Sequence, residues 1–308
     1  FGADLLRLWV ASSDCRVDVR VSDAIFKQLS QAYLKIRNTA RYILGNLEGF
    51  DANNLTAAED MLPLDRWAIT RLNDLIERCI KGYEDYEYHI VYHAIYNFCV
   101  VDMSNFYLDV IKDRLYCEER DGAQRRSAQT AMFLILDAMV RLLGPILAFT
   151  SDEIWQAMPH RASDDAENVI LNQMPKPYAD YALDAETLAV WQKYVVLRDG
   201  VNLKLEEARA AKLIGKPLEA AVTLCCGDEV MVLLAGKEEL LRTLFIVSDV
   251  MLVAGNGGED CAELPGVSIS VQAASGEKCE RCWMYAHTVG TDAEHPTLCA
   301  RCAGVVRA

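Results

Sequence analysis

Four cysteines near the end of the chain have the spacing of metal ligands. The pairs Cys279–Cys282 and Cys299–Cys302 are separated by sixteen residues. Two residues between the members of a pair let both sulfurs reach one metal ion from a tight turn, and two such pairs complete a tetrahedron. Thiolates would fill all four positions and leave none for a catalytic water, so we predict one structural Zn²⁺ ion per chain. A pair of disulfides, an iron site and chance spacing are the alternatives.

The cysteine-rich segment is too short to fold through burial alone. About 30 residues do not enclose a sufficient apolar core, so the metal would supply the folding energy. Trp283 follows the second cysteine directly. The ring could pack under the metal-binding turn, or it could be exposed and stack on a nucleic-acid base, an interaction worth about 1–3 kcal/mol per base.

A second group of residues suited to binding lies near the start of the chain. Between Gln31 and Leu47 there are three positive charges and no acidic residue. On a helix, Arg37, Asn38 and Arg41 would be surface neighbours. Their forked donors suit phosphates or base edges, although an ordinary solvated helix face would have the same composition.

Other patterns that would indicate catalysis are missing from the sequence. His89 and His93 have the spacing of a helical zinc pair, but Ile90 stands where a zincin motif requires Glu, so interior or interfacial histidines are the preferred interpretation. The sequence contains no P-loop, no glycine-rich dinucleotide fingerprint and no Gly-x-Ser-x-Gly elbow. We therefore expect no active site in this chain.

The first half of the chain predicts helices that pack as an antiparallel bundle. Apolar residues recur every three or four positions after Ser22, a candidate N-cap, and again after Pro63. We expect helices at 22–49, 63–80, 83–116 with a break near Asp102–Asn105, and 125–143. Thr150 and Glu153 suggest a capping box for a further helix.

The second half predicts a charged helix followed by a small α+β domain. The helix spans about 185–213, and alternating or apolar runs then suggest strands at 219–225, 229–234, 250–253 and 267–272, with a helix at 238–245. The predicted fold class is thus mainly α: an antiparallel helical bundle, a small α+β junction domain and a four-cysteine zinc module.

Composition limits the choice of partners and compartment. With 31 basic and 45 acidic residues the net charge is −14, which disfavours non-specific nucleic-acid binding but allows a local basic face. No apolar run is long enough for a membrane span. Seven scattered cysteines favour a reducing compartment, the cytoplasm by default; these are Cys15, Cys79, Cys99, Cys117, Cys225, Cys226 and Cys261. The first residue is Phe1, so we expect a piece of a longer protein.

Several of these segments together resemble one family. The run from Gly2 to Asp14, the segment Lys35-Ile-Arg-Asn-Thr-Ala-Arg41, the segments 92–98 and 112–117, and both cysteine pairs with Trp283 resemble bacterial isoleucyl-tRNA synthetases. The resemblance covers nearly the whole chain. It implies a class I ligase that joins isoleucine to tRNA(Ile) with ATP and Mg²⁺, a cytoplasmic parent protein that is a monomer.

The resemblance also implies a division of the chain. Its boundaries would be 1–21 for the tail of the catalytic or stem-contact region, 22–158 for the anticodon-binding domain, 159–184 for a connecting loop, 185–274 for the helix and junction domain, and 275–308 for the zinc module. The family's ATP-binding motifs and its editing domain are absent, so we expect this chain alone to be inactive and to recognise the anticodon stem-loop beside the rest of the synthetase chain. Cys279, Cys282, Cys299 and Cys302 would be the zinc ligands. Arg37, Asn38, Arg41 and Trp283 would contact tRNA.

Two other functions remain open at this stage. One is a zinc-stapled helical scaffold that binds protein partners and no RNA. The other is the matching part of a valine or leucine enzyme, against which the C-terminal zinc module argues.

Overall fold

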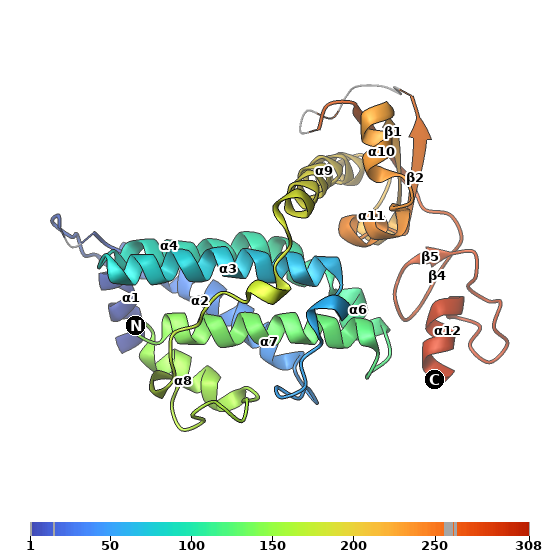
Figure 1. Cartoon of the computed structure of the whole chain (residues 1–308). Helices are drawn as coiled ribbons and strands as arrows, with labels where there is room; N and C mark the ends of the chain where they lie inside the picture. Colours follow the sequence, from blue (N-terminus) through green and yellow to red (C-terminus); the bar gives the residue numbers. More distant parts are fainter. Residues whose placement is uncertain (1, 15, 256–260, 262–263, 308) are drawn as a thin grey trace. The chain divides into compact units, whose positions relative to one another are not determined.

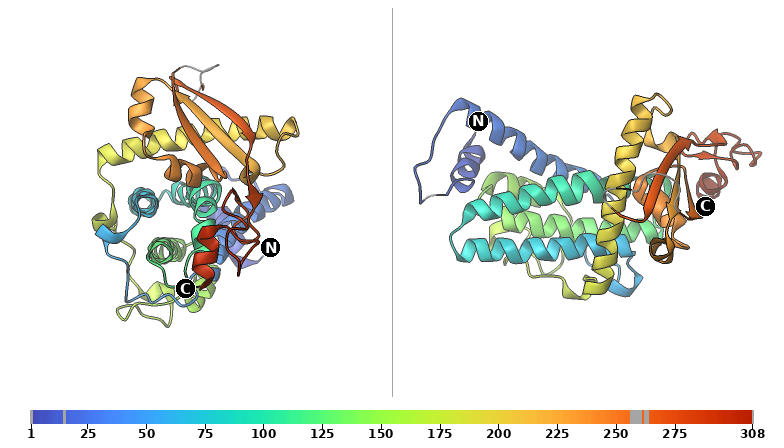
Figure 2. Two further views of the ribbon diagram at one scale, coloured as in Figure 1. Left: turned by 90° about the vertical axis from the view of Figure 1, so that its right-hand side faces the viewer. Right: turned by 90° about the horizontal axis from the view of Figure 1, so that it is seen from above.

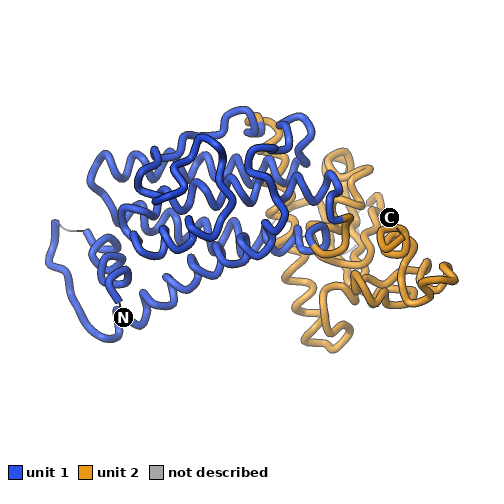
Figure 3. Tube along the Cα trace, turned by 90° about the horizontal axis from the view of Figure 1, so that it is seen from below, with its two compact units in different colours: residues 1–115, 120–183 blue, residues 116–119, 184–308 orange. Residues whose placement is uncertain are grey.

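The computed structural model describes residues 2–14, 16–255, 261 and 264–307. The chain divides into two compact units, shown in Figure 3: unit 1 is Phe1–Leu115 with Arg120–Leu183, and unit 2 is Tyr116–Glu119 with Asp184–Ala308. Phe1 and Cys15, which entered the sequence predictions, lie outside the described residues. Among the helices of the described chain, none is both long and apolar enough to cross a membrane.

Unit 1 is a helical bundle, as predicted. Its elements are α1 (Ala3–Ala11), α2 (Asp23–Gly45), the 3-10 turn η1 (Ala58–Asp60), α3 (Pro63–Glu84), α4 (Tyr88–Asn97), α7 (Ala123–Leu143) and α8 (Ala148–Ala157). Figures 1 and 2 show α3, α4 and α7 side by side. The apolar period of α2 explains its buried face, made of Leu29, Ala32, Ile36, Ala40 and Ile43. The Ser22 hydroxyl accepts from the Ile25 amide at 3.3 Å, which confirms the predicted N-cap.

The expected break near Asp102–Asn105 is wrong. The chain stays helical from α4 through a π-helix, η2 (Phe98–Tyr107), into α5 (Leu108–Val110) and α6 (Lys112–Cys117). A polar residue of this segment has its partner on a neighbouring helix: Asp102 accepts from Arg71 Nε of α3 at 3.0 Å. Phe106 meets Trp67 edge to face, with ring centroids 4.7 Å apart. These contacts with α3 hold η2 in a helical path, information that a local pattern does not contain.

A buried ionic cluster lies inside the bundle. Arg114 donates to both oxygens of Asp65, at 2.9 and 2.8 Å, and the two side chains are only 8% and 0% exposed. Tyr107 and Ser127 donate to the same carboxylate at 2.8 and 2.5 Å. A buried charge pair is tolerated only when its remaining hydrogen-bonding capacity is met, and these two hydroxyls meet it here.

The predicted capping box at Thr150 is also wrong. Helix α8 begins at Ala148, so Thr150 lies inside its first turn. The Thr150 amide and hydroxyl both donate to Asp4 of α1, at 2.7 and 2.6 Å. An acid from another helix thus satisfies the first turn of α8 and leaves Glu153 available for a different partner.

The proline-containing segment after α8 is fixed to the bundle. It contains only two short 3-10 turns, η3 (Val169–Leu171) and η4 (Ala179–Tyr181). Asp164 accepts from Arg141 of α7 at 2.8 Å, and the Tyr178 amide donates to Asn73 of α3 at 2.8 Å. Side chains of the helices therefore supply the hydrogen bonds that regular structure would otherwise provide.

Unit 2 contains a three-stranded sheet beside a long helix. Helix α9 (Ala185–Ala210) starts at the N-cap Asp184 and leads through η5 (Pro217–Glu219) to the sheet. The strand order is β2-β1-β3, with β2 (Asp249–Ala254) parallel and β3 (Val267–Ala273) antiparallel to β1 (Ala220–Cys226). A parallel neighbour requires a crossover, and α10 (Asp228–Leu234) with α11 (Glu238–Phe245) forms it.

Helix α10 corrects the predicted strand at 229–234. Short apolar runs do not distinguish strand from helix. Here Val230 and Leu234, four positions apart, are buried, whereas Val232 between them is 84% exposed. Acidic residues in the first turn, Asp228 and Glu229, further favour the helix. The chain ends with β4 (Glu277–Lys278), β5 (Tyr285–Ala286) and α12 (Ala300–Arg307).

Candidate metal centre

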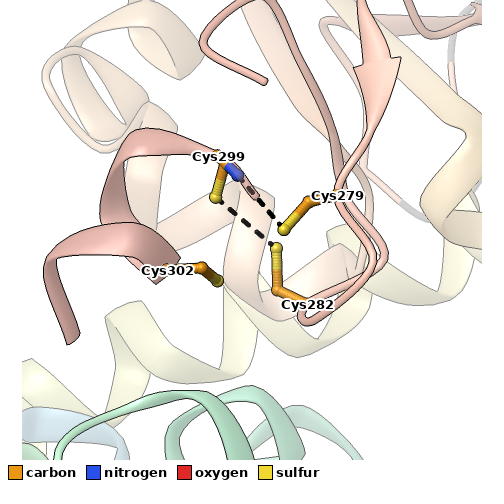
Figure 4. A group of neighbouring side chains, drawn as sticks. All are labelled: Cys279, Cys282, Cys299 and Cys302. Carbon is orange, nitrogen blue, oxygen red and sulfur yellow. Dashed lines mark hydrogen bonds between the residues drawn. The ribbon is translucent and has the colours of Figure 1, made fainter. Parts of the chain in front are cut away.

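Two short elements of unit 2 present the four predicted cysteine ligands. Strands β4 and β5 pair antiparallel, and the turn between them contains Cys279 and Cys282. Cys299 directly precedes α12 and Cys302 lies in its first turn. Figure 4 shows all four sulfurs pointing toward one another from these two segments. The sequence prediction of a single four-cysteine site is confirmed.

The geometry of the cysteine cluster fits a tetrahedral metal. All four sulfur atoms lie within 4.8 Å of one another, and Cys282 Sγ is 3.9 Å from Cys299 Sγ. Zinc–sulfur bonds of about 2.3 Å in a tetrahedron place the sulfurs about 3.8 Å apart. None of the ten described cysteines forms a disulfide, which excludes that alternative for these pairs. Cys279 and Cys302 are fully buried and the other two are 7% exposed, so the site is closed to solvent.

The protonation of the cluster shows why it needs a cation. Burial alone would raise the pKa of Cys279, but backbone amides of Cys282, Cys299 and Arg281 outweigh it and lower that pKa to about 6. Burial and the neighbouring cysteines raise the pKa of Cys282, and burial raises that of Cys302. Four buried thiolates therefore repel one another unless a divalent cation compensates their charge. The chemistry of this donor set fits zinc, which would have a structural role.

The ligands of the metal centre are supported by two residues, Arg281 and Cys117, that the sequence analysis did not assign to it. Arg281 lies between the first two ligands; its Nη1 is 3.8 Å from Cys302 Sγ and 2.5 Å from the carbonyl of Cys117. Cys117 itself is buried within the same cluster as the four ligands. Arg281 could have been suspected from its place inside the Cys-x-x-Cys pair, whereas nothing in the sequence relates Cys117 to a segment more than 160 positions away.

Trp283 is exposed beside the metal centre. The side chain is 56% exposed, so packing under the metal-binding turn does not describe it. Its backbone has φ of 64°, an unusual value for a bulky residue, and its amide donates to the Cys279 carbonyl at 2.9 Å. The ammonium groups of Lys216 and Lys278 lie 5.7 and 5.9 Å from the ring centroid. The metal-binding turn therefore presents an aromatic ring with two cations next to it.

The predicted basic face on α2 contains both paired and unpaired groups. Arg37 Nη2 donates to Glu153 at 2.6 Å and Nη1 donates to the Tyr33 hydroxyl at 3.1 Å, and these hydrogen bonds, chiefly the one to the Glu153 carboxylate, raise the Arg37 pKa. The sequence shows no acid near Arg37, but the fold supplies one from α8. Asn38 and Arg41 are exposed, and within the described chain their side chains have no hydrogen-bond or ion-pair partner.

The two histidines do not contribute to a metal site. The preferred interpretation from the sequence is an interior or interfacial position; His89 is half-buried and His93 is exposed, so an interior position is wrong for His93 and an interfacial one stays a prediction. Among the described residues, the four cysteines form the only group of three or more potential ligands that converge on one point.

Two family models match the chain. Residues 65–224 match "Anticodon-binding domain of tRNA ligase", and residues 276–304 match "Zinc finger found in FPG and IleRS". The second match covers all four cysteines and identifies the metal as zinc, which removes the iron alternative.

Similar curated proteins agree with these matches. The chain is 49% identical to an isoleucine–tRNA ligase of Syntrophotalea carbinolica over 99% of its length, which is 33% of that protein. Identity to the isoleucine–tRNA ligase of Desulforamulus reducens is 48%, over 99% of the chain and 33% of the relative. The isoleucine–tRNA ligase of Geobacter sulfurreducens is 44% identical, over 100% of the chain and 33% of the relative. The chain thus spans about a third of the length of the relatives it matches.

Proposed function

Because the chain belongs to the anticodon-binding domain family of tRNA ligases and is homologous to isoleucine–tRNA ligases over their C-terminal third, we propose that it recognises the anticodon region of tRNA(Ile). The whole ligase would charge this tRNA with isoleucine at the expense of ATP. The sequence of this chain has no His-x-Gly-His and no Lys-Met-Ser-Lys-Ser motif. The proposed role here is therefore RNA recognition alone, in a monomeric parent of a reducing, cytoplasmic compartment.

The observation that carries this proposal is the exposed surface of α2. Asn38 and Arg41 face solvent with their donors unused by any described residue. Anticodon bases are unstacked and accessible, so a few such donors are sufficient to bind phosphates and base edges. In a chain of net charge −14, the part of the helix face at Asn38 and Arg41, where no described acid is paired, is the surface to which RNA would be attracted. We include Arg37 in this surface as the weaker contributor, because Glu153 already holds its guanidinium.

We further propose that separate segments of the chain have separate roles. Residues 22–158 would form the anticodon-binding domain, preceded by a strip of the stem-contact region at 1–21 and followed by the connecting segment at 159–184. Residues 185–274 would be the junction, and 275–308 would bring the ring of Trp283 to the RNA.

Direct binding measurements test the proposal. The zinc-loaded chain is titrated with tRNA(Ile) and with tRNA(Val) at two salt concentrations, and the titration is repeated after the metal has been removed. We expect a preference for tRNA(Ile) that weakens with salt and falls on metal removal. Preference that survives metal removal would assign recognition to the bundle alone. Equal affinity for both tRNAs would contradict the isoleucine assignment, and absence of binding would favour a zinc-stapled scaffold for protein partners.

A further inference from the structure

The environment of Trp283 combines three features. The ring is 56% exposed, its backbone is in the left-handed region, and two lysine ammonium groups lie within 6 Å of its centroid. A bulky residue with positive φ is costly and persists only where the surrounding structure enforces it. The Cys279 carbonyl, which accepts from the Trp283 amide, and the adjacent ligand Cys282 provide that enforcement.

The two lysines come from separate parts of unit 2. Lys216 lies in the connection between α9 and β1, just before η5, and Lys278 belongs to β4. Both are exposed, and within the described residues neither forms an ion pair with a carboxylate. Since no described carboxylate holds either ammonium group in an ion pair, both are available to an anionic ligand.

We propose that Trp283, Lys216 and Lys278 form a binding subsite for one unpaired nucleotide of RNA, with the base stacked on the indole and its flanking phosphates bound by the two lysines. This inference rests on the function proposed above and adds Lys216 and Lys278 to the RNA-binding residues. Exposed aromatic rings next to cations are the usual means of holding single-stranded RNA, because every base has a π-face and every nucleotide carries a phosphate. Such a subsite is tolerant of sequence, because stacking uses the face of the base and does not read its edges.

Glu219 sets the electrostatic balance of the subsite. Its carboxylate accepts from the Gly215 amide at 2.7 Å. Hydrogen bonds from the Gly215 and Lys216 amides and the charges of Lys216 and Lys278 lower the Glu219 pKa. The cluster of two ammonium groups and one carboxylate therefore has a net charge of +1. Removal of the carboxylate charge should favour an anionic ligand, whereas removal of the lysine charges should disfavour it.

The test compares charge variants in the zinc-loaded chain. The double variant K216Q/K278Q is titrated with tRNA(Ile) across a range of salt concentrations. Loss of two phosphate contacts to a single strand should reduce the slope of log affinity against log salt by about 1.4. The matched control is Lys237→Gln, an exposed lysine of the same unit that is not near Trp283, and it should change the slope little.

Two further variants separate stacking from charge. Trp283→Ala should weaken binding about tenfold or more, while Trp283→Phe should retain most of the affinity because the ring remains. Glu219→Gln should tighten binding, since glutamine keeps an acceptor for Gly215 but removes the negative charge. Zinc content measured on every variant verifies that the module is intact.

The outcomes distinguish this inference from the proposed function. If the unmodified chain binds tRNA(Ile) but K216Q/K278Q behaves like Lys237→Gln, the nucleotide subsite is wrong and anticodon binding still stands. If the unmodified chain binds no tRNA, the proposed function fails first. Weaker binding by Glu219→Gln would also overturn the charge argument.

Discussion

The bundle and the zinc module reach a stable structure by different physical means. In the bundle, α7 is buried over nearly its whole length, and the ionic cluster around Asp65 is sealed inside. In the zinc module, the buried cluster consists of the four ligands with Cys117, and regular structure is limited to two-residue strands and one short helix. A long amphipathic chain can exclude enough water to fold, whereas a segment of about 30 residues depends on coordination. The bundle therefore tolerates substitutions at its surface, whereas the zinc module depends on each of its four sulfur ligands.

Loss of a zinc ligand should have the largest effect on stability, and this effect should be limited to the zinc module. We expect Cys302→Ser, or removal of zinc by a chelator, to unfold residues 277–307, since structural zinc contributes about 10–16 kcal/mol of binding free energy. Hydrogen exchange should then show those amides unprotected and α7 unchanged. Cys225→Ser, outside the cluster, should retain a full zinc content. Protection of 277–307 in the zinc-free chain would contradict the distinction between the bundle and the zinc module.

Disruption of the buried ion pair should be the largest single effect within the bundle. Asp65→Asn leaves the Arg114 guanidinium buried without its counter-charge, and we expect a loss of about 3–5 kcal/mol in the free energy of unfolding. Urea titration measures it. The control is Asp74→Asn, which removes a solvent-exposed partner of Arg71 and should cost under about 1 kcal/mol. Similar costs for both variants would show that burial of the pair is unimportant.

Substitution on α2 should separate a binding residue from a structural one. Arg41→Gln should lower the affinity for tRNA(Ile) and reduce the salt slope by about 1, without changing the unfolding midpoint. Arg37→Gln should have the smaller effect on binding, and it should lower stability by at most about 1 kcal/mol through loss of the Glu153 pair. The reverse pattern would mean that the ion pair with Glu153 opens when RNA binds.

The smallest expected effect concerns the N-cap of α9, a part of unit 2 that hydrogen bonds stabilise without a metal. Hydrogen bonds from the Thr187 amide and hydroxyl lower the Asp184 pKa below its ordinary value of 3.8. A carboxyl with a depressed folded-state pKa stabilises the fold above its unfolded pKa, and this contribution is lost as the pH falls through the folded pKa. Urea unfolding of the wild type and Asp184→Asn at pH 7 and at acid pH should therefore show a difference that shrinks below pH 3.8. A constant difference would contradict the role of charge.

The sequence alone determined those features whose cause is local. The Cys-x-x-Cys spacing specified the metal ligands because a tight turn and the first turn of a helix each bring two sulfurs within bonding distance of one ion. The apolar period of α2, its cap at Ser22 and the strands β1, β2 and β3 were likewise readable, since burial on one face imposes a period on the sequence.

Tertiary structure decided the features that depend on partners distant in the chain. Glu153 neutralises Arg37, Asp4 satisfies the first turn of α8, and Arg71 stabilises the continuous helix through Asp102, although no local pattern indicates these pairs. The run at 229–234 is a helix because a parallel pair of strands needs a crossover, a requirement of the sheet and not of the run itself. Lys216 and Lys278 meet Trp283 only when the sheet and the zinc-binding turn fold together, because spatial proximity between distant residues is set by packing and has no period in the sequence.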